Sequence, residues 1–84
     1  MSKAQQVELN IKLSDELASF LITKPEILKK YSGYSYVVFS SVNPELNRLN
    51  NDLIHELLLE GNGVIKAEAT GNSSQPWVLT PVMN

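Results

Sequence analysis

The sequence predicts an α/β domain in which one or two N-terminal helices precede a right-handed βαβ unit. Residues 36–42 form a β-branched and aromatic run, which is typical of a buried strand. Asn43 and Pro44 follow as a favourable cap and first residue of a helix that Gly61 ends, and residues 64–70 then alternate as a second strand. A strand, a helix and a strand in this order pair in parallel with a right-handed crossover. We therefore expect a small two- or three-stranded, mainly parallel sheet.

The length and composition are those of one small globular domain, residues 1–84. Hydrophobic residues make up 43% of the chain and charged residues 19%, which is typical of a folded protein rather than a disordered one. A chain of this size buries roughly 60–65% of its unfolded surface, and without cysteine it has no disulfide to stabilise it. Small domains of this kind often gain buried area by oligomerising, so we expect a homodimer or a partner protein.

The charge pattern and the N-terminus argue against several classes of partner. The net charge is −2, and Lys29 and Lys30 are the only adjacent basic residues, so no nucleic-acid partner is expected. The first residues are polar, unlike a secretory signal, and no run approaches the ~20 apolar residues that a membrane span needs. The sequence therefore predicts a cytoplasmic protein that does not contact a membrane.

The N-terminal segment allows two interpretations. Residues 1–8 are polar and are expected to be flexible, whereas residues 7–13 alternate between apolar and polar in the manner of a strand. A helical face competes with that alternation, because five apolar residues fall at helical spacing: Leu9, Leu13, Leu17, Phe20 and Leu21. We favour a helix from about Ile11 to Thr23, capped by Asn10 or by Ser14, and the strand over residues 7–13 remains the alternative.

The rest of the chain divides at turn residues. A proline ends the first helix and opens a short second one over residues 25–30. The βαβ core then spans residues 36–70, and residues 71–76 form a polar loop. The tail, residues 77–84, begins as an apolar strand that Pro81 confines to a sheet edge. This strand either completes the sheet of its own chain or extends to another chain.

Two asparagines lie on the apolar side of the predicted helix over residues 44–60. Asn50 falls inside the apolar arc of that helix, and Asn47 lies between two of its apolar residues. A buried amide without partners costs about 1–3 kcal/mol, so Asn50 needs hydrogen bonds if it is inside. It either ties the helix to a strand end or to the loop of residues 31–35, or it marks a polar spot at a subunit or ligand interface, or the helix is rotated and the amide is solvated.

No residue pattern predicts catalysis. His55 is the only histidine and lies on the solvated side of its helix, without a serine or cysteine at helical spacing beside it. A lone histidine and no cysteine do not make a zinc site, and the carboxylates are not paired for acid–base chemistry. We therefore expect neither an enzyme nor a cofactor or metal.

The carboxyl end of the first strand is the best candidate for a ligand site. Ser41 and Asn43 lie where open α/β sheets bind ligands and where a helix N-terminus can hold an anion. No glycine-rich loop is present, however, and Glu45 places a negative charge where a phosphate would bind. Helix capping and turn formation are the favoured explanation of these residues.

Several of these segments together resemble a known family. They are Pro25-Glu26-Ile27-Leu28, Tyr36-Val37-Val38-Phe39, the helix start Asn43-Pro44-Glu45-Leu46-Asn47 with Asn50, and Glu60-Gly61 before a strand. Over about residues 9–70 the chain resembles a family of small prokaryotic α/β domains of unknown function. The resemblance implies a helix–strand–helix–strand fold and adds no catalytic residue. Residues 71–84 depart from the family pattern.

The favoured function is that of a small cytoplasmic interaction module that self-associates or binds a partner protein, as an accessory or antitoxin-like subunit would. The alternative is a module that binds a small molecule or an anion at the carboxyl end of the first strand. The candidate interface or ligand residues are Ser41, Asn43, Asn47, Asn50 and Trp77.

Overall fold

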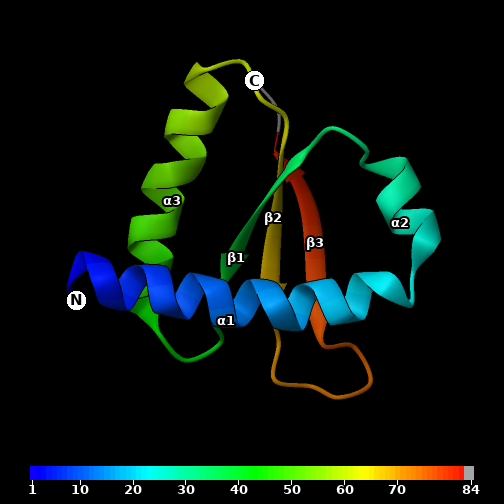
Figure 1. Cartoon of the computed structure of the whole chain (residues 1–84), viewed down its shortest axis with the longest axis horizontal. Helices are drawn as coiled ribbons and strands as arrows, with labels where there is room; N and C mark the ends of the chain where they lie inside the picture. Colours follow the sequence, from blue (N-terminus) through cyan, green and yellow to red (C-terminus); the bar gives the residue numbers. More distant parts are fainter. Residues whose placement is uncertain (83–84) are drawn as a thin grey trace.

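Two helices, a strand, a third helix and two further strands make up the chain (Figure 1). This computed structural model describes residues 1–82, so the last two residues of the predicted tail lie outside the described part. The elements are α1 (Lys3–Ile22), α2 (Pro25–Lys30), β1 (Ser35–Phe39), α3 (Pro44–Leu59), β2 (Val64–Ala69) and β3 (Trp77–Val82). The predicted class, N-terminal helices followed by a βαβ unit, is confirmed.

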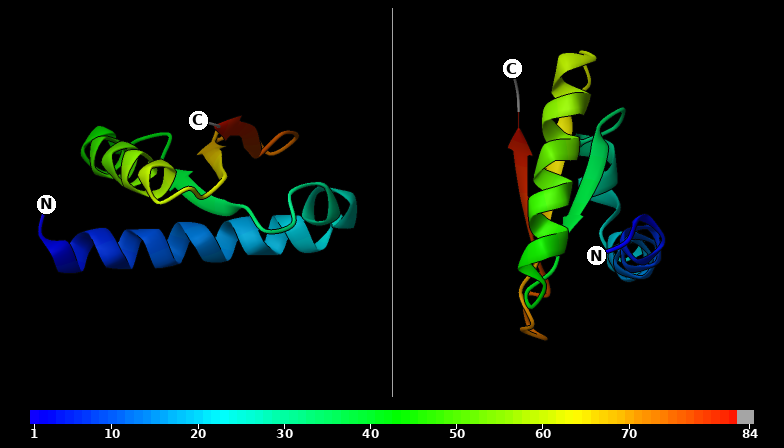
Figure 2. Two further views of the ribbon diagram at one scale, coloured as in Figure 1. Left: turned by 90° about the horizontal axis from the view of Figure 1, so that it is seen from above. Right: turned by 90° about the vertical axis from the view of Figure 1, so that its left-hand side faces the viewer.

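The sheet is three-stranded, with β2 in the middle. β1 runs parallel to β2, with Ser35 opposite Val64, and α3 connects the two strands by a right-handed crossover (Figures 1 and 2). β3 runs antiparallel to β2, with Ala69 opposite Trp77. The tail therefore provides an edge strand, and the sheet is mixed: the expected parallel arrangement holds for β1 and β2.

Helices pack on both faces of this sheet (Figure 2). On one face, α1 and α2 cover a cluster whose buried members are Leu17, Leu21, Val38, Ala67 and Trp77. On the other face, α3 covers a cluster of Val37, Phe39, Ile54 and Val64. Successive residues of β1 alternate between the two clusters, as the pleat of a strand requires. β1 is thus buried on both faces, as its continuous apolar run predicts.

The first helix is longer than the sequence indicates. It begins at Lys3, not near Ile11, because Ser2 and Gln5 form a capping box: the Ser2 hydroxyl accepts from the Gln5 N–H, and the Gln5 side chain accepts from the Ser2 N–H. The alternative strand over residues 7–13 is wrong, and the segment expected to be flexible is helical from Lys3 onward. Ile11, an apolar member of the alternation, is 60% exposed. The apolar–polar alternation of residues 7–13 therefore does not correspond to buried and exposed positions.

The first strand is shorter than predicted. It ends at Phe39 and not at Val42, and the outward backbone N–H and C=O of the next residue, Ser40, bond to the side chain of Asn47. The α3 helix ends close to its predicted boundary, and Gly61 follows with a φ of 85°, the left-handed conformation that glycine adopts readily. In residues 1–82, no helix is long and apolar enough to cross a bilayer.

Candidate functional site

Asn50 joins three elements from a fully buried position in α3. Its Nδ2 donates to the Val38 carbonyl at 2.8 Å and to Asn10 Oδ1 at 2.7 Å. Its Oδ1 accepts from Asn10 Nδ2 at 3.3 Å and from Gln6 Nε2 at 3.4 Å. The amide is therefore satisfied on all sides. The predicted tie to a strand is present, whereas the tie to α1 escaped prediction because Asn10 was assigned as a helix cap.

Asn47 closes the outer edge of β1 together with Asn50. The Ser35 N–H donates to the Gly63 carbonyl at 2.9 Å, so by alternation the backbone groups of Val38 and Ser40 point away from β2. Asn50 binds the Val38 carbonyl, and Asn47 binds the N–H and C=O of Ser40 at 2.7 and 2.8 Å. Side-chain amides thus occupy backbone groups that another strand would need. Protection of this kind is how native sheets avoid pairing at an edge.

At the outer edge of β3, no side chain of residues 1–82 binds the backbone in this way. The Thr70 N–H donates to the Pro76 carbonyl at 3.0 Å, so alternation directs the backbone groups of Trp77, Leu79 and Pro81 away from β2. Pro81 lacks an N–H and therefore suits an outward position on an edge strand. β3 contains no charged residue, and β2 is the only strand it pairs with in the described chain. This edge is open to a further strand.

A cleft of about 580 Å³ lies at the carboxyl end of β1, between α1 and the two loops that follow β1 and β2. Its lining is mostly apolar and includes Leu13, Phe20, Leu46, Ala69, Pro76 and Trp77. Ser41 and Asn43 border it from one loop, and Ser73 borders it from the other. The volume and the mixture of an apolar lining with a few polar groups are those of small-molecule sites.

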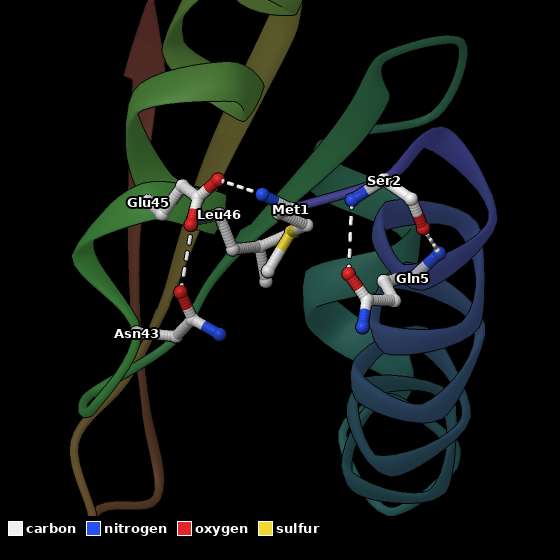
Figure 3. A network of polar contacts seen from close by, with 6 residues as sticks. All are labelled: Met1, Ser2, Gln5, Asn43, Glu45 and Leu46. Carbon is white, nitrogen blue, oxygen red and sulfur yellow. Dashed lines mark hydrogen bonds and ion pairs between the residues drawn. The ribbon is translucent and has the colours of Figure 1, made fainter.

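The start of α3 has little capacity for an anion. Asn43 Oδ1 already accepts from the Leu46 N–H at 3.0 Å, and Pro44 has no N–H to offer. Glu45 adds a carboxylate in the first turn, where it contacts the N-terminal ammonium of Met1 and so bridges the starts of α1 and α3 (Figure 3). The helix N-terminus is thus occupied by its own cap and by an acid.

Two charged side chains, Lys12 and Glu16, line the cleft, and both come from α1. They lie one helical turn apart, and within the described residues neither takes part in an ion pair. An adjoining hollow of about 540 Å³ shares Lys12 and Asn43 with the cleft and is also lined by Glu8 and Glu45. The sequence did not predict these α1 residues, because the packing of α1 against the loops is tertiary. Their spacing of four residues, which places them on one face of a helix, is the signal that could have found them.

The five predicted site residues therefore divide into two groups. Ser41, Asn43 and Trp77 come together around the cleft. Asn47 and Asn50 lie outside its lining and bind the backbone of β1, and Asn50 is fully buried. The ligand candidates thus lie on the loops and β3, while the two α3 asparagines have a structural role because they connect α3 to β1.

Other titratable groups do not gather into a reactive centre. His55 is exposed on α3. In the part of the chain that the structure describes, no three His, Cys, Asp or Glu side chains lie together as a metal would require. Within residues 1–82, the hydroxyl of Tyr36 is buried without a hydrogen-bond partner. Burial raises the pKa of this phenol, and the neighbouring Tyr31 adds to the shift.

Comparison of the chain with protein-family models, with curated proteins and with solved structures finds no match. The resemblance to small prokaryotic domains over residues 9–70 therefore stays a prediction. Any function has to be argued from the open edge of β3 and from the cleft.

Proposed function

We propose that the protein is a small interaction module that self-associates through β3. The observation that carries this proposal is the contrast between the two edges of the sheet. Amides from α3 occupy the outer backbone groups of β1 at its carboxyl end. β3 presents an apolar strand without charge, and although Pro81 removes one outward N–H, those of Trp77 and Leu79 remain to pair with another strand. A cytoplasmic location and a non-catalytic role are parts of the same proposal.

A second copy fits this edge in the antiparallel direction. With Leu79 opposite Leu79 of the other copy, the two residues exchange both backbone hydrogen bonds. Trp77 then lies opposite Pro81 and donates to its carbonyl, so every outward N–H of both strands finds an acceptor. The missing N–H of Pro81 leaves only the Trp77 carbonyl without a partner. This two-fold arrangement joins the two sheets into one.

Substitutions on the exposed side of β3 test the proposal. Val78 and Thr80 are exposed, and in the two-fold arrangement each faces the other across the interface. Lysine at both positions places like charges opposite each other, which destabilises cross-strand pairing by about 0.2–1 kcal/mol per pair. We expect wild-type protein to show concentration-dependent dimerisation in sedimentation velocity, and the V78K/T80K variant to remain monomeric.

A matched control carries the same added charge elsewhere. Val7 and Ile11 are exposed on α1, away from β3, so the V7K/I11K variant should dimerise as the wild type does. Circular dichroism checks that all three proteins are folded. A wild-type protein that stays monomeric up to millimolar concentration, or a V78K/T80K variant that dimerises normally, would contradict the proposal. If the V78K/T80K variant also fails to bind a partner protein that the wild type binds, the same edge of β3 mediates that contact.

The cleft supports a second function, which is the binding of a small molecule. Its supporting observation is that Ser41, Asn43 and Trp77 meet there around a volume suited to a ligand. The occupied start of α3 argues against an anion and for an uncharged or internally balanced molecule. A thermal-shift screen of small metabolites tests this function, with Ser41→Ala and Asn43→Asp as variants, since aspartate keeps the cap. No stabilisation by any compound, or stabilisation that both variants leave unchanged, would count against it.

A further inference from the structure

We infer that the cleft takes a zwitterion with an apolar side chain, the chemical class of the free aliphatic and aromatic α-amino acids. This inference rests on the second of the proposed functions and names its ligand. It follows from three features of the cleft: an apolar floor, one positive and one negative side chain on the same rim, and uncharged hydrogen-bonding groups on the opposite rim.

The floor suits an apolar side chain of moderate size. Leu13 and Phe20 from α1 face the same space as Trp77 from β3, and Ala69 and Pro76 complete the floor. Trp77 is only 6% exposed, so most of its ring is already packed against the core. A ligand side chain placed on this floor removes further apolar surface from water, at about 25 cal/mol per Å².

The charges on the α1 rim match a zwitterion. Lys12 suits a carboxylate and Glu16 suits an ammonium, and the two are one turn apart on the same side of the helix. A lysine that precedes a glutamate by four residues is the weaker order for a helical ion pair, and no ion pair joins them in the described chain. Both charges therefore remain available to a ligand that carries one charge of each sign.

The neighbouring charges belong to the adjoining hollow. Glu8 lies one turn before Lys12, and the Glu45 carboxylate contacts the Met1 ammonium. On the opposite rim the groups are neutral: the hydroxyls of Ser41 and Ser73, and the Nδ2 of Asn43, whose Oδ1 is used by the helix cap. A ligand with a single charge would engage only one of Lys12 and Glu16, whereas a zwitterion engages both.

Trp77 makes the test direct, because it is the only tryptophan and it lines the cleft. The full-length protein is titrated with L-leucine and L-phenylalanine while Trp77 fluorescence is followed. The matched probes are N-acetyl-L-leucine, which lacks the ammonium, and L-leucinamide, which lacks the carboxylate. We expect a saturable fluorescence change with the amino acids and binding at least about tenfold weaker for each single-charge analogue, a loss equivalent to about 1.4 kcal/mol.

Variants locate the two charges. Lys12→Met should weaken leucine binding while leaving leucinamide unaffected, and Glu16→Gln should weaken leucine binding while leaving N-acetyl-leucine unaffected. Lys3→Met and Asp15→Asn change charges of α1 that do not line the cleft and serve as controls. Two-dimensional ¹H–¹⁵N spectra provide a second readout that does not depend on Trp77.

The outcomes separate the two claims. If a single-charge analogue binds as tightly as leucine, the cleft is a ligand site but the zwitterion inference is wrong. If none of the four probes perturbs the fluorescence or the spectra at about 10 mM, a concentration at which even millimolar affinity would be detected, the inference is overturned. A metabolite screen that also gives no stabilisation then overturns the ligand-binding function itself.

Discussion

Asn50 shows how one polar side chain can fix the relative positions of three elements. Its amide binds the Val38 carbonyl in β1 and pairs with Asn10 in α1, from a helix that packs on the opposite face of the sheet. The hydrogen bond to Val38 also removes an acceptor from the outer edge of β1. The position of Asn50 within an apolar arc predicted that its amide needs hydrogen-bond partners. Which residues these are depends on tertiary packing, which the local sequence does not specify.

Replacement of this amide by an isosteric apolar group tests its structural role. Asn50→Leu leaves the Val38 carbonyl and the Asn10 amide without partners, so we expect a loss of about 1–3 kcal/mol in the free energy of unfolding. Urea denaturation measures it. Asn51→Leu is the matched control, because Asn51 is exposed on the same helix and its replacement should change stability by less than about 0.5 kcal/mol. Equal effects of the two substitutions would contradict the assigned network.

The buried hydroxyl of Tyr36 leads to the opposite expectation. Because this hydroxyl has no partner, Tyr36→Phe removes an unsatisfied polar group and should stabilise the protein by about 1 kcal/mol. Burial raises the phenol pKa in the folded state above its ordinary value of about 10. The unfolded chain therefore loses its proton first, and wild-type stability falls as pH rises above that value.

The Tyr36→Phe substitution should remove that part of the pH dependence. The measurement is the difference in unfolding free energy between variant and wild type, at pH 7 and at pH 10.5. We expect this difference to grow with pH in favour of the variant. A difference that is constant or shrinks would show that the Tyr36 phenol ionises at least as readily in the folded state as in the unfolded one.

At the scale of elements, the sequence predicted the helix boundaries that are set by residues next to them in the chain. The helix over residues 25–30 begins at a proline, and α3 lies between the Asn43-Pro44 start and Gly61, so the sequence located both closely. The end of β1 was misplaced because the apolar and hydroxyl residues after Phe39 continue the strand-like pattern, whereas the chain turns there and Asn47 binds the backbone of Ser40. The start of α1 was misplaced because its capping box lies in a segment whose polarity suggested flexibility.

The α3 cap offers a test at this scale. Asn43→Ala removes the acceptor for the Leu46 N–H and should lower stability by about 1 kcal/mol, within the range for lost N-caps. Asn43→Asp keeps the acceptor and places a negative charge at the helix start, where the dipole favours it. Thermal unfolding of both variants should therefore show a clear loss for alanine and little change for aspartate. A similar loss for both would mean that the Nδ2 group, not the cap, is the important part of the side chain.

At the scale of the whole molecule, the two halves of the sheet are covered unequally. The α3 helix packs mainly over β1, and on that face β3 presents Val78 and Thr80 to solvent. Lys66 partly covers the same face by placing its ammonium 4.7 Å from the centre of the Phe39 ring. The sequence predicted an apolar tail of uncertain destination. The structure places Trp77 in the core, and no strand of the described chain pairs with the outer backbone of β3.

The cleft depends on the same long-range packing. Trp77, and Ser41 with Asn43, were identified as candidates from two separate local signals. The charged rim of Lys12 and Glu16 became visible only when α1 was placed against the loops. Positions far apart in sequence form the site, and no single segment carries a motif for it.

The central claim, that β3 mediates self-association, is tested most directly by charge complementation. V78K/T80K and V78E/T80E each place like charges across the two-fold interface. Each also makes one favourable and one unfavourable pair with Glu68 and Lys66 in its own sheet, so the two variants are matched within the monomer. We predict that each variant alone sediments as a monomer and that their equimolar mixture sediments as a dimer. A mixture that remains monomeric, or single variants that remain dimeric, would contradict the account.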